Sequence, residues 1–258
     1  MGDVKNTLVV SVVSHGHGEM VQKLLYQLAA LEESGLLRVV LTQNIKESLP
    51  DAPASGWPFI FEVRSNSTPK GFSANHNAAL IGAEEDFLCL MNPDVDLLQN
   101  NPFPPLMRVL ERPGVGLAYP LQIDDQGSLQ DSEREVPTIF SLYQRYFCSR
   151  VESRPEWVNA AFWIVKREAW LRLCGLDARF FMYCEDVDFC LRLRLKGWKL
   201  ARSNTVVRHQ AHRDSHRKLK YTFWHVCALA RLWSRPVFWR AKWKINQLSV
   251  DELIVQDK

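Results

Sequence analysis

Residues 7–14, with the sequence TLVVSVVS, form a continuous run of apolar and β-branched residues near the start of the chain. Such a run is typical of a strand that is buried on both faces of a parallel sheet. Apolar residues at helical spacing follow it, and three more short apolar runs come later, at residues 36–42, 59–63 and 86–91. Because these predicted strands alternate with helices, the sequence predicts an α/β fold with a doubly wound, mostly parallel sheet.

Polar residues follow three of the predicted strands. Ser14 and His15 follow the first strand, Gln43 and Asn44 follow the second, and residues 92–96 (NPDVD) follow the fourth. In open α/β sheets, ligands bind at the carboxyl ends of the parallel strands. The sequence therefore predicts a ligand site at this edge of the sheet.

Asp94 is the candidate metal ligand at this edge. It lies in the sequence NPD, in which Asn92 takes the place of the first acid of a D-x-D pattern. A carboxylate directly after a buried strand can hold a hard divalent cation that bridges a diphosphate. The same three residues are common in turns, so the motif alone leaves both interpretations open. His209, at the end of a later predicted strand, is a candidate further ligand.

A zinc site is the alternative for the histidines, but their spacing matches no zinc motif and no paired cysteines accompany them. The residues that it would use are His209, His212, His216, Cys184 and Cys190.

Residues 71–77 (GFSANHN) form a glycine-led segment before a predicted helix. Glycine lets the backbone approach a ligand closely, and Asn77 offers both a hydrogen-bond donor and an acceptor. No G-K-[ST] sequence follows, which excludes a Walker loop. A simple glycine turn before a helix is the alternative interpretation.

Residues 180–198 (FFMYCEDVDFCLRLRLKGW) place three acids, Glu185, Asp186 and Asp188, between an aromatic run and a predicted helix. The helix dipole favours carboxylates at this position. Burial and mutual repulsion can raise a carboxylate pKa towards values that suit a general base. An acidic helix cap without a catalytic role is the alternative. We expect Asp188 to hold the helix start.

The second half of the chain shows fewer regular patterns. Residues 131–156 lack periodicity and predict an irregular, mobile loop near the site. Apolar runs and turn signals predict strands at 114–119, 157–165 and 199–207, helices at 102–111 and 166–174, and a hairpin at 121–129.

Length and composition exclude several classes of protein. A chain of 258 residues with 47% hydrophobic content is long enough for one substantial domain. Its six cysteines form no C-x-x-C pair, which indicates reduced thiols in a cytosolic protein rather than disulfides or a zinc ribbon. No run of about 18 apolar residues occurs, so we expect no membrane span.

The net charge of +3 hides an uneven distribution. Residues 208–244 contain ten Lys or Arg and one acid, a local charge of +9, whereas residues 1–207 carry −4. A basic segment of this kind indicates an anionic partner. Its aromatic residues could stack on nucleic acid, lie on an anionic membrane surface, or pack on the core. They are Tyr221, Phe223, Trp224, Trp233, Phe238, Trp239 and Trp243.

Together, these motifs resemble family 2 glycosyltransferases of the GT-A fold, in particular bacterial rhamnosyltransferases that extend lipid-linked O-antigen, lipopolysaccharide or related cell-surface glycans. The resemblance covers residues 7–225. The motifs that carry it, in order, are SHGH after the first strand, G-F-x-x-x-x-N, NPDV, FFMYCEDVDFCLRL with the later GW, and His209.

The resemblance implies an inverting, metal-dependent transfer of L-rhamnose from dTDP-β-L-rhamnose to a hydroxyl of a polyprenyl-diphosphate-linked sugar. Transfer from a UDP-hexose is one alternative. A scaffold that binds a nucleotide sugar without catalysis is another.

The resemblance also implies a role for each candidate residue. Asp186 would be the general base, and Glu185 would orient it or contact the acceptor. Asp94 and His209 would hold Mg²⁺ or Mn²⁺ on the donor diphosphate. The donor would be lined by Ser14, His15, Gln43, Asn44, Asn77, Asn92 and Asp94, and the acceptor by Trp157, Asn159, Tyr183 and Arg192.

Three departures from the family pattern alter these expectations. Gln43 and Asn44 stand where an Asp usually ends the second strand, and Pro69 replaces an Asn. Residues 159–161 (NAA) replace a turn of a small residue and glycine. We expect altered nucleotide contacts and acceptor preference, but retained activity because Asp94 and Asp186 are present.

The resemblance divides the chain into a GT-A domain, residues 1–210, and basic aromatic helices, residues 211–258. Residues 1–98 would bind the nucleotide sugar and residues 99–210 the acceptor. We expect the C-terminal helices to contact an anionic membrane surface and no nucleic acid. The protein would then be cytoplasmic and peripheral on the inner face of the bacterial cytoplasmic membrane.

Overall fold

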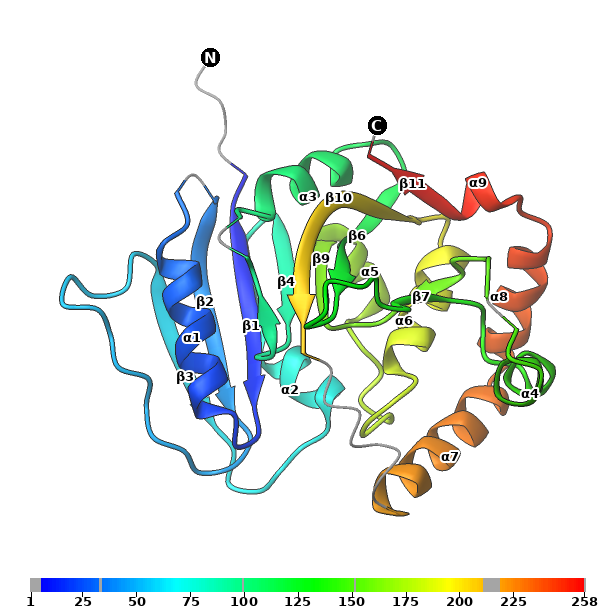
Figure 1. Cartoon of the computed structure of the whole chain (residues 1–258), viewed down its shortest axis with the longest axis horizontal. Coiled ribbons are helices and arrows are strands. Elements are labelled where there is room, and N and C mark those ends of the chain that lie inside the picture. The colour runs from blue at the N-terminus through cyan, green and yellow to red at the C-terminus, as the bar shows by residue number, and fades with distance from the viewer. Residues whose placement is uncertain (1–5, 33, 99, 151, 211–218, 258) are drawn as a thin grey trace.

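A computed structural model describes residues 6–32, 34–98, 100–150, 152–210 and 219–257. A sheet of nine strands forms the centre of this part of the chain (Figure 1). Eight strands follow the order β11-β10-β6-β9-β4-β1-β2-β3, and the ninth, β5, pairs with β10. The strands are β1 (Leu8–Ser14), β2 (Leu36–Gln43), β3 (Ile60–Ser65), β4 (Phe87–Met91), β5 (Val95–Asp96), β6 (Val115–Ile123), β9 (Phe162–Lys166), β10 (Lys199–His209) and β11 (Ile254–Gln256).

Most neighbouring strands of this sheet run parallel. The parallel pairs are β1 with β2, β1 with β4, β2 with β3, β6 with β10, and β10 with β11. β9 runs antiparallel to β4 and β6, and β5 runs antiparallel to β10. The predicted doubly wound, mostly parallel sheet is confirmed.

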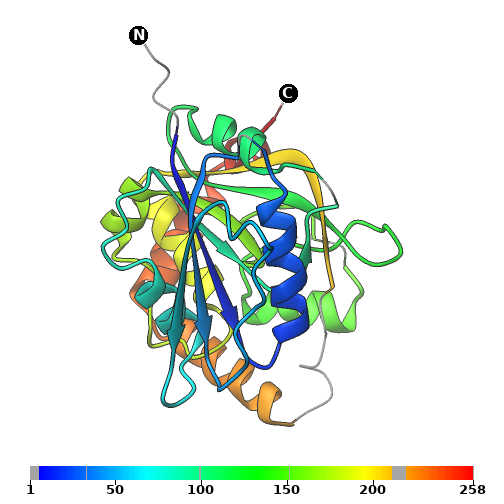
Figure 2. The same cartoon turned by 90° about the vertical axis from the view of Figure 1, so that its left-hand side faces the viewer.

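Helices cover both faces of the sheet. Helices α1 and α3 pack on one face, whereas α2, α5, α6 and α8 pack on the other, and Figure 2 shows α1 on the opposite side of the sheet from α6 and α8. The helices are α1 (Gly18–Ala29), α2 (Phe72–Ala79), α3 (Phe103–Leu110), α4 (Ile139–Phe147), α5 (Arg167–Leu173), α6 (Glu185–Leu195), α7 (Leu219–Trp233), α8 (Pro236–Asn246) and α9 (Val250–Leu253).

The alternation of side chains along β1 explains why its whole run is apolar. Val9 belongs to the core on the side of α6, whereas Val10 and Val12 belong to the core on the side of α1. Both faces of the strand are therefore buried, as expected for a central strand of an α/β sheet. Helix α1 contributes Leu24 and Leu28 to the same core from one of its faces.

The parallel register brings the carboxyl ends of the strands to one edge. Ser14 pairs with Gln43, and Val12 pairs with Met91, so the residues after β1, β2 and β4 are neighbours. Figure 1 shows β1, β2 and β10 pointing to this edge.

Two expectations about the second half of the chain were wrong. Residues 157–165 form two strands, β8 (Trp157–Val158) and β9, separated by a turn at residues 159–161. Residues 131–156 contain β7 (Glu133–Arg134), which pairs with β8, and α4, which begins with a capping box of Thr138 and Ser141. Apolar periodicity missed α4 because most of its apolar side chains face solvent rather than the core.

The C-terminal segment packs on the core through one set of residues and exposes another. Leu232, Phe238 and Ile245 are fully buried, whereas Trp239 and Trp243 are exposed. The segment then adds β11 to the sheet beside β10, a three-residue strand that is too short to predict from pattern. Within the described residues, no helix combines the length and the apolar character that crossing a bilayer requires.

Candidate active site

Polar side chains at the ends of β1 and β2 form a connected hydrogen-bond network. Asn44 is its centre: its Nδ2 lies 3.2 Å from His15 Nδ1, and its Oδ1 accepts from Lys70 N at 2.7 Å and from Asn66 Nδ2 at 2.9 Å. Asn66 Nδ2 also donates to Asn75 Oδ1 at 2.7 Å. The network fixes the loops that surround this edge, and His15 remains exposed above it.

Gln43 is buried and holds the loop after β2. Its Nε2 donates to the carbonyl oxygens of Glu47 and Ser48, and its Oε1 accepts from Ser65 Oγ. Gln43 therefore holds the backbone of the loop after β2. Its predicted contact with the donor stays a prediction.

Glu47 is a carboxylate that the sequence analysis missed. Its Oε2 accepts from Ser14 Oγ at 2.7 Å, and its Oε1 accepts from Gly16 N at 2.9 Å. An acid thus lies beside the SHGH segment, although Gln43 and Asn44 replace the usual Asp at the end of β2. No local pattern marks Glu47, because only the folding of its loop brings it to Ser14.

Asp94 and His209 come together through the antiparallel pairing of β5 with β10. Val95 pairs with His209, and Gln210 N donates to Asp94 O at 3.1 Å. Asp94 Oδ1 lies 3.5 Å from His209 Nε2. No described residue donates a hydrogen bond to this buried oxygen.

Gln130 sets the tautomer of His209. Its Nε2 donates to His209 O at 2.6 Å, so its Oε1 must accept, and that oxygen lies 3.1 Å from His209 Nδ1. In the neutral ring, Nδ1 then carries the proton and Nε2 presents a lone pair to Asp94 Oδ1. Two facing lone pairs fit a shared cation. Metal-binding histidines typically donate their other ring N–H to a neighbouring oxygen, as Nδ1 of His209 does to Gln130.

The described residues offer no group of three or more His, Cys, Asp or Glu side chains that could hold a metal. Asp94 and His209 would therefore hold a cation whose other ligands come from substrate and water, which is how Mg²⁺ is commonly bound. For the zinc alternative, His212 and His216 lie outside the described residues.

Glu185 and Asp186 form the first turn of α6. Tyr183 and Cys184 precede them with positive φ values of 71° and 62°, a backbone conformation that costs energy for residues other than glycine. This double left-handed bend turns the chain into the helix with the acids at its positive end. A strained bend before two acids is typical of a functional segment.

Burial raises the pKa of both acids. Burial is the main cause for Glu185, whose pKa lies well above its usual value, and the neighbouring Asp186 charge adds to it. Glu185 Oε2 has no hydrogen-bond partner among the described residues. Burial raises the pKa of Asp186 to about 6, against hydrogen bonds from backbone N–H groups, including Val187 N at 2.8 Å, and the charge of Arg134. Carboxylates with pKa values raised in this way are typical of acid–base sites.

The turn at residues 159–161 joins the Asp94 segment to the Asp186 segment. Asn92 N donates to Ala161 O at 2.8 Å, and the backbone of Ala160 lies close enough to Asp186 to lower the pKa of its carboxyl group. The segments that carry Asp94 and Asp186 therefore meet at one turn. The Asn159 side chain exchanges hydrogen bonds with Gln122 and shapes this turn.

Arg134 is a second residue that the sequence analysis missed. Its guanidinium lies over the Trp157 ring, 5.7 Å from the ring centroid, and its charge acts on Asp186. Trp157 is itself fixed by a hydrogen bond from its Nε1 to Glu135 O. The pairing of β7 with β8 brings Arg134 to Trp157, and that pairing was not predicted.

Three other predicted site residues make contacts within the fold. Both polar atoms of Asn77 bind the backbone of Leu176. Arg192 donates to Asp188 and to the carbonyl oxygens of Leu173 and Gly175. The Tyr183 ring lies 5.0 Å from the His225 ring of α7. Their predicted donor and acceptor contacts stay predictions.

Gly71 serves chain packing. A Cβ atom at Gly71 would lie 2.4 Å from Phe181 O, and Phe72 N donates to the same oxygen at 2.9 Å. The glycine is therefore required where the loop before α2 crosses the segment before α6. This contact joins the two halves of the site.

The sequence suggested that Asp188 holds the start of α6, but the structure shows a different role. It is fully buried and bonds to Arg192, four residues later, and to Arg235, which precedes α8. The residue before α6 caps the helix without a side-chain hydrogen bond. Asp188 lies two residues from Asp186, so the two side chains leave opposite sides of the helix.

No family model matches the sequence. Rhamnosyltransferase WbbL of Escherichia coli (strain K12) is 25% identical over 247 residues, which cover 88% of this chain and 92% of the relative. The N-acetylglucosaminyl-diphospho-decaprenol L-rhamnosyltransferase of Mycobacterium tuberculosis (strain ATCC 25618 / H37Rv) is 24% identical over 257 residues, which cover 84% of each chain.

Among solved structures, the mannosyltransferase PcManGT from Pyrobaculum calidifontis, in complex with GDP-Man and Mn²⁺, superposes with a TM-score of 0.53. The match covers 94% of this chain and 75% of that chain at 16% sequence identity. The fold is therefore the GT-A fold that the sequence predicts.

Proposed function

Because this chain is a glycosyltransferase of the GT-A fold, similar in sequence to bacterial rhamnosyltransferases, we propose that it transfers L-rhamnose from dTDP-β-L-rhamnose to a polyprenyl-diphosphate-linked sugar. The observation that carries the proposal is the turn at residues 159–161, which connects Asn92 to Asp186. The turn supports the proposal because it brings Asp186, the proposed general base, near the NPD motif, which could serve a diphosphate donor. The names of both relatives support the sugar, and the name of the second supports the lipid-linked acceptor.

In this proposal, residues 1–98 bind the donor at the carboxyl edge of the sheet. Asn44 and Glu47 hold the loops around His15, so the nucleotide meets a fixed edge. Asp94 and His209 would hold Mg²⁺ or Mn²⁺, and the solved mannosyltransferase with Mn²⁺ is consistent with metal use. When bound, the ion would neutralise the charge of the leaving diphosphate.

Residues 99–210 bind the acceptor, and Asp186 takes its proton. The acceptor hydroxyl oxygen forms the new bond to the anomeric carbon as the bond from that carbon to the diphosphate oxygen breaks. Attack from the face opposite the diphosphate inverts the configuration. Asp186 accepts the hydroxyl proton. The charge of Arg134 favours the ionised form of Asp186 and opposes the effect of burial on its pKa. Burial and the Asp186 charge raise the pKa of Glu185, which favours the protonated form that can donate a hydrogen bond to the acceptor.

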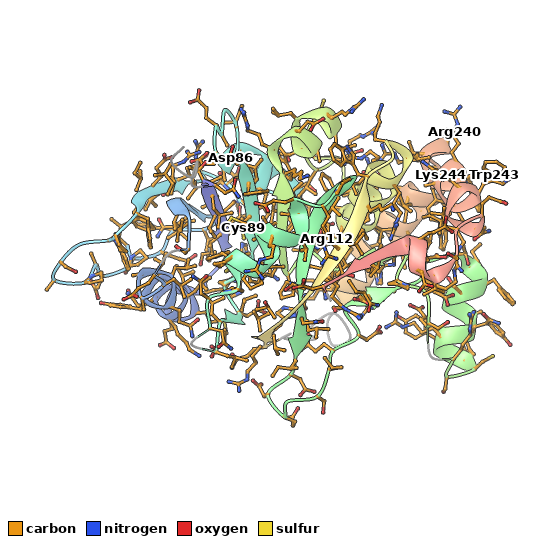
Figure 3. All side chains as sticks on the ribbon, turned by 90° about the horizontal axis from the view of Figure 1, so that it is seen from above. Asp86, Cys89, Arg112, Arg240, Trp243 and Lys244 are labelled. Atoms are coloured by element: carbon orange, nitrogen blue, oxygen red, sulfur yellow. The ribbon has the colours of Figure 1, made fainter. Side chains whose placement is uncertain are left out.

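Exposed apolar side chains on α4, α7 and α8 support contact with a membrane surface. Helix α4 exposes Ile139, Phe140, Tyr143, Tyr146 and Phe147, and α7 exposes Phe223 and Val226. Trp233 Nε1 of α7 donates to Pro137 O before α4, so these two helices are neighbours (Figure 1). On α8, Arg240, Trp243 and Lys244 lie together at an outer edge (Figure 3). Aromatic and basic residues together suit an anionic lipid surface, and we place the protein peripherally on the inner face of the bacterial cytoplasmic membrane.

A panel of nucleotide sugars tests the proposal directly. The purified protein is incubated with a lipid-diphosphate-GlcNAc acceptor, Mg²⁺ or Mn²⁺, and dTDP-rhamnose, UDP-glucose, UDP-galactose or UDP-GlcNAc. We expect product only with dTDP-rhamnose. Product only with a UDP-hexose would replace the donor assignment, and donor binding without product from any sugar would favour a scaffold.

A further inference from the structure

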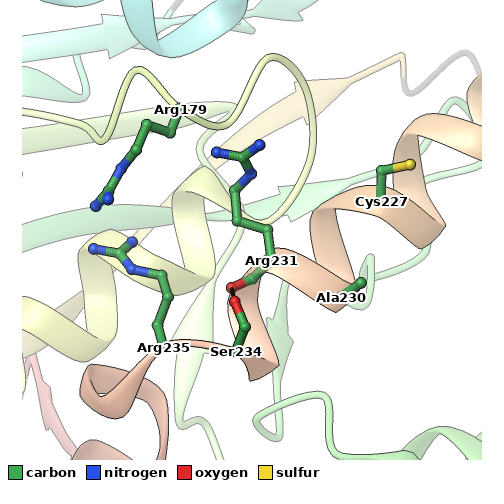
Figure 4. Close-up of a pocket in the computed structure, with 6 residues that line it drawn as sticks. All are labelled: Arg179, Cys227, Ala230, Arg231, Ser234 and Arg235. Atoms are coloured by element: carbon green, nitrogen blue, oxygen red, sulfur yellow. Dashed lines mark hydrogen bonds between the residues drawn. The ribbon is translucent and has the colours of Figure 1, made fainter.

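A pocket separate from the donor edge lies between α7 and the segment before α6. Its volume is about 460 Å³, within the range of small-ligand sites. Figure 4 shows Arg179, Arg231 and Arg235 entering it from the segment before α6, from α7 and from the turn before α8. The lining residues are Arg179, Cys227, Ala230, Arg231, Ser234 and Arg235, and we call this site the arginine pocket.

The charges around the arginine pocket do not cancel. Asp177 pairs with Arg179 and Arg235, each at 2.7 Å, and Asp188 pairs with Arg235 and Arg192. Arg231 is exposed and forms no ion pair within the described residues. The cluster therefore holds four guanidinium groups and two carboxylates, an excess of two positive charges.

Such an excess favours a doubly charged anion. The planar fork of an arginine matches the oxygens of a phosphate group, and several arginines around one concave site are typical of phosphate recognition. Asp177 and Asp188 fix Arg235, and Asp177 fixes Arg179, which limits the side-chain entropy that anion binding would cost.

Helix α7 connects the pocket to an apolar stripe. Phe223, Cys227, Ala230 and Ser234 follow the spacing of one helix face, and Phe223 and Val226 are 66% and 60% exposed. A ligand with a phosphate at one end and a hydrocarbon chain at the other would meet both surfaces.

We propose that the arginine pocket binds the phosphate group of a lipid, with the hydrocarbon chain along Phe223 and Val226. Two sources share this chemistry: the diphosphate of the polyprenyl-linked acceptor and the headgroup of an anionic phospholipid. The first source rests on the proposed function, and the anion binding does not. Asp188 and Asp186 belong to one helix but leave opposite sides of it, so a ligand in the pocket would lie across α6 from Asp186.

Thiol labelling of Cys227 gives a readout that is independent of transfer. Cys148 and Cys174 are also exposed, so both are replaced by serine to leave Cys227 as the exposed thiol of the described residues. Labelling is followed with no addition, with pyrophosphate, with geranyl diphosphate, and with vesicles of phosphatidylglycerol or phosphatidylcholine, all without divalent metal. We expect geranyl diphosphate to slow labelling at least fivefold, and pyrophosphate to do so at higher concentration.

Arg231→Gln removes the unpaired guanidinium, and Arg108→Gln removes an exposed arginine of α3 outside the pocket as a matched control. Loss of one charged hydrogen-bonding group should weaken geranyl diphosphate binding roughly tenfold in Arg231→Gln only. Protection by phosphatidylglycerol alone, again sensitive to Arg231, would assign the pocket to a phospholipid headgroup.

Two outcomes would overturn the proposal: no protection by any phosphate-bearing probe, or equal protection in both arginine variants. Binding of dTDP in the presence of Mg²⁺ should be unchanged in Arg231→Gln. If the pocket binds no phosphate, the donor-binding assay still tests the proposed function. If the protein does not transfer rhamnose, the labelling assay still tests the pocket.

Discussion

Asp94 Oδ1 and His209 Nε2 face each other at 3.5 Å where β5 meets the end of β10. Gln130 directs the proton of the neutral ring to Nδ1, so both facing atoms offer lone pairs. Such a pair is stable when a cation or a proton lies between the two atoms. The relationship joins the first half of the chain to the second at the place where a donor diphosphate would bind.

Asp94→Asn should weaken metal-dependent donor binding. The amide removes the charge that would hold the cation while it keeps the shape of the side chain. We expect at least a tenfold loss of dTDP-rhamnose affinity in calorimetry with Mg²⁺ or Mn²⁺, and His209→Ala should act in the same direction. Asp125→Asn, in an exposed turn, serves as the control. Wild-type affinity that does not respond to metal would contradict the role of this pair.

Asp186→Asn should reduce transfer by roughly 10²–10⁴-fold, the usual contribution of a general base. Because the amide cannot accept the proton, the loss should be in kcat, with donor affinity retained. Product formation is measured with a lipid-diphosphate-GlcNAc acceptor, and thermal unfolding checks that the variant is folded. Transfer at the wild-type rate would remove Asp186 from the mechanism.

The pH dependence of transfer should report the ionisation of Asp186 and the effect of the Arg134 charge on it. Asp186 must be ionised to accept a proton, so activity should rise with pH through about 6. Arg134 lowers the pKa of Asp186, and its removal must raise that pKa further. Arg134→Gln should therefore move the acidic limb to higher pH, and Arg134→Lys should restore part of the shift. Arg108→Gln, which removes an exposed arginine on α3, is the control. If the acidic limb of the pH–activity profile lies at the same pH in both variants, Arg134 does not influence the pKa of Asp186.

Asp188→Ala should destabilise the fold. The substitution leaves the Arg192 guanidinium without its ion-pair partner and removes one of the two carboxylates that bind Arg235, which keeps Asp177. Breaking a buried ion pair on one side costs about 3–5 kcal/mol. Urea unfolding should show a loss of about 3 kcal/mol or more. Asp186→Asn should change the unfolding free energy far less, since no arginine depends on Asp186 for an ion pair among the described contacts. Similar stability losses in the two variants would contradict the separation of their roles.

The exposed aromatic face of α4 should contribute to membrane binding. The double variant Phe140→Ser, Phe147→Ser removes two large apolar side chains that are 67% and 78% exposed, so folding should be retained. We expect co-sedimentation with phosphatidylglycerol vesicles to fall at least fivefold. Ile81→Ser, which removes an equally exposed apolar side chain after α2, should bind as the wild type does. Equal binding by both variants would exclude α4 from the contact.

Local patterns were sufficient where burial imposed them. The run at 7–14 predicted β1 because both faces of that strand are buried, and the acids after residue 184 marked the start of α6. The same reasoning failed for α4, whose apolar side chains face solvent, and for β7, which is two residues long. Asp188 was misread because its partner Arg235 lies far along the chain.

The sequence by itself determined the fold class, the edge of the sheet where we predict a ligand site, and the candidate acids Asp94 and Asp186. Strand and helix periodicity, and polar residues after buried strands, are local properties of the chain. Only the tertiary structure decided the surroundings of these acids: His209, itself held by Gln130, for Asp94, and Arg134 and the 159–161 turn for Asp186. The physical reason is that pKa values and metal affinity depend on burial and on charges within a few ångströms, which strand pairing brings together and residue order does not reveal.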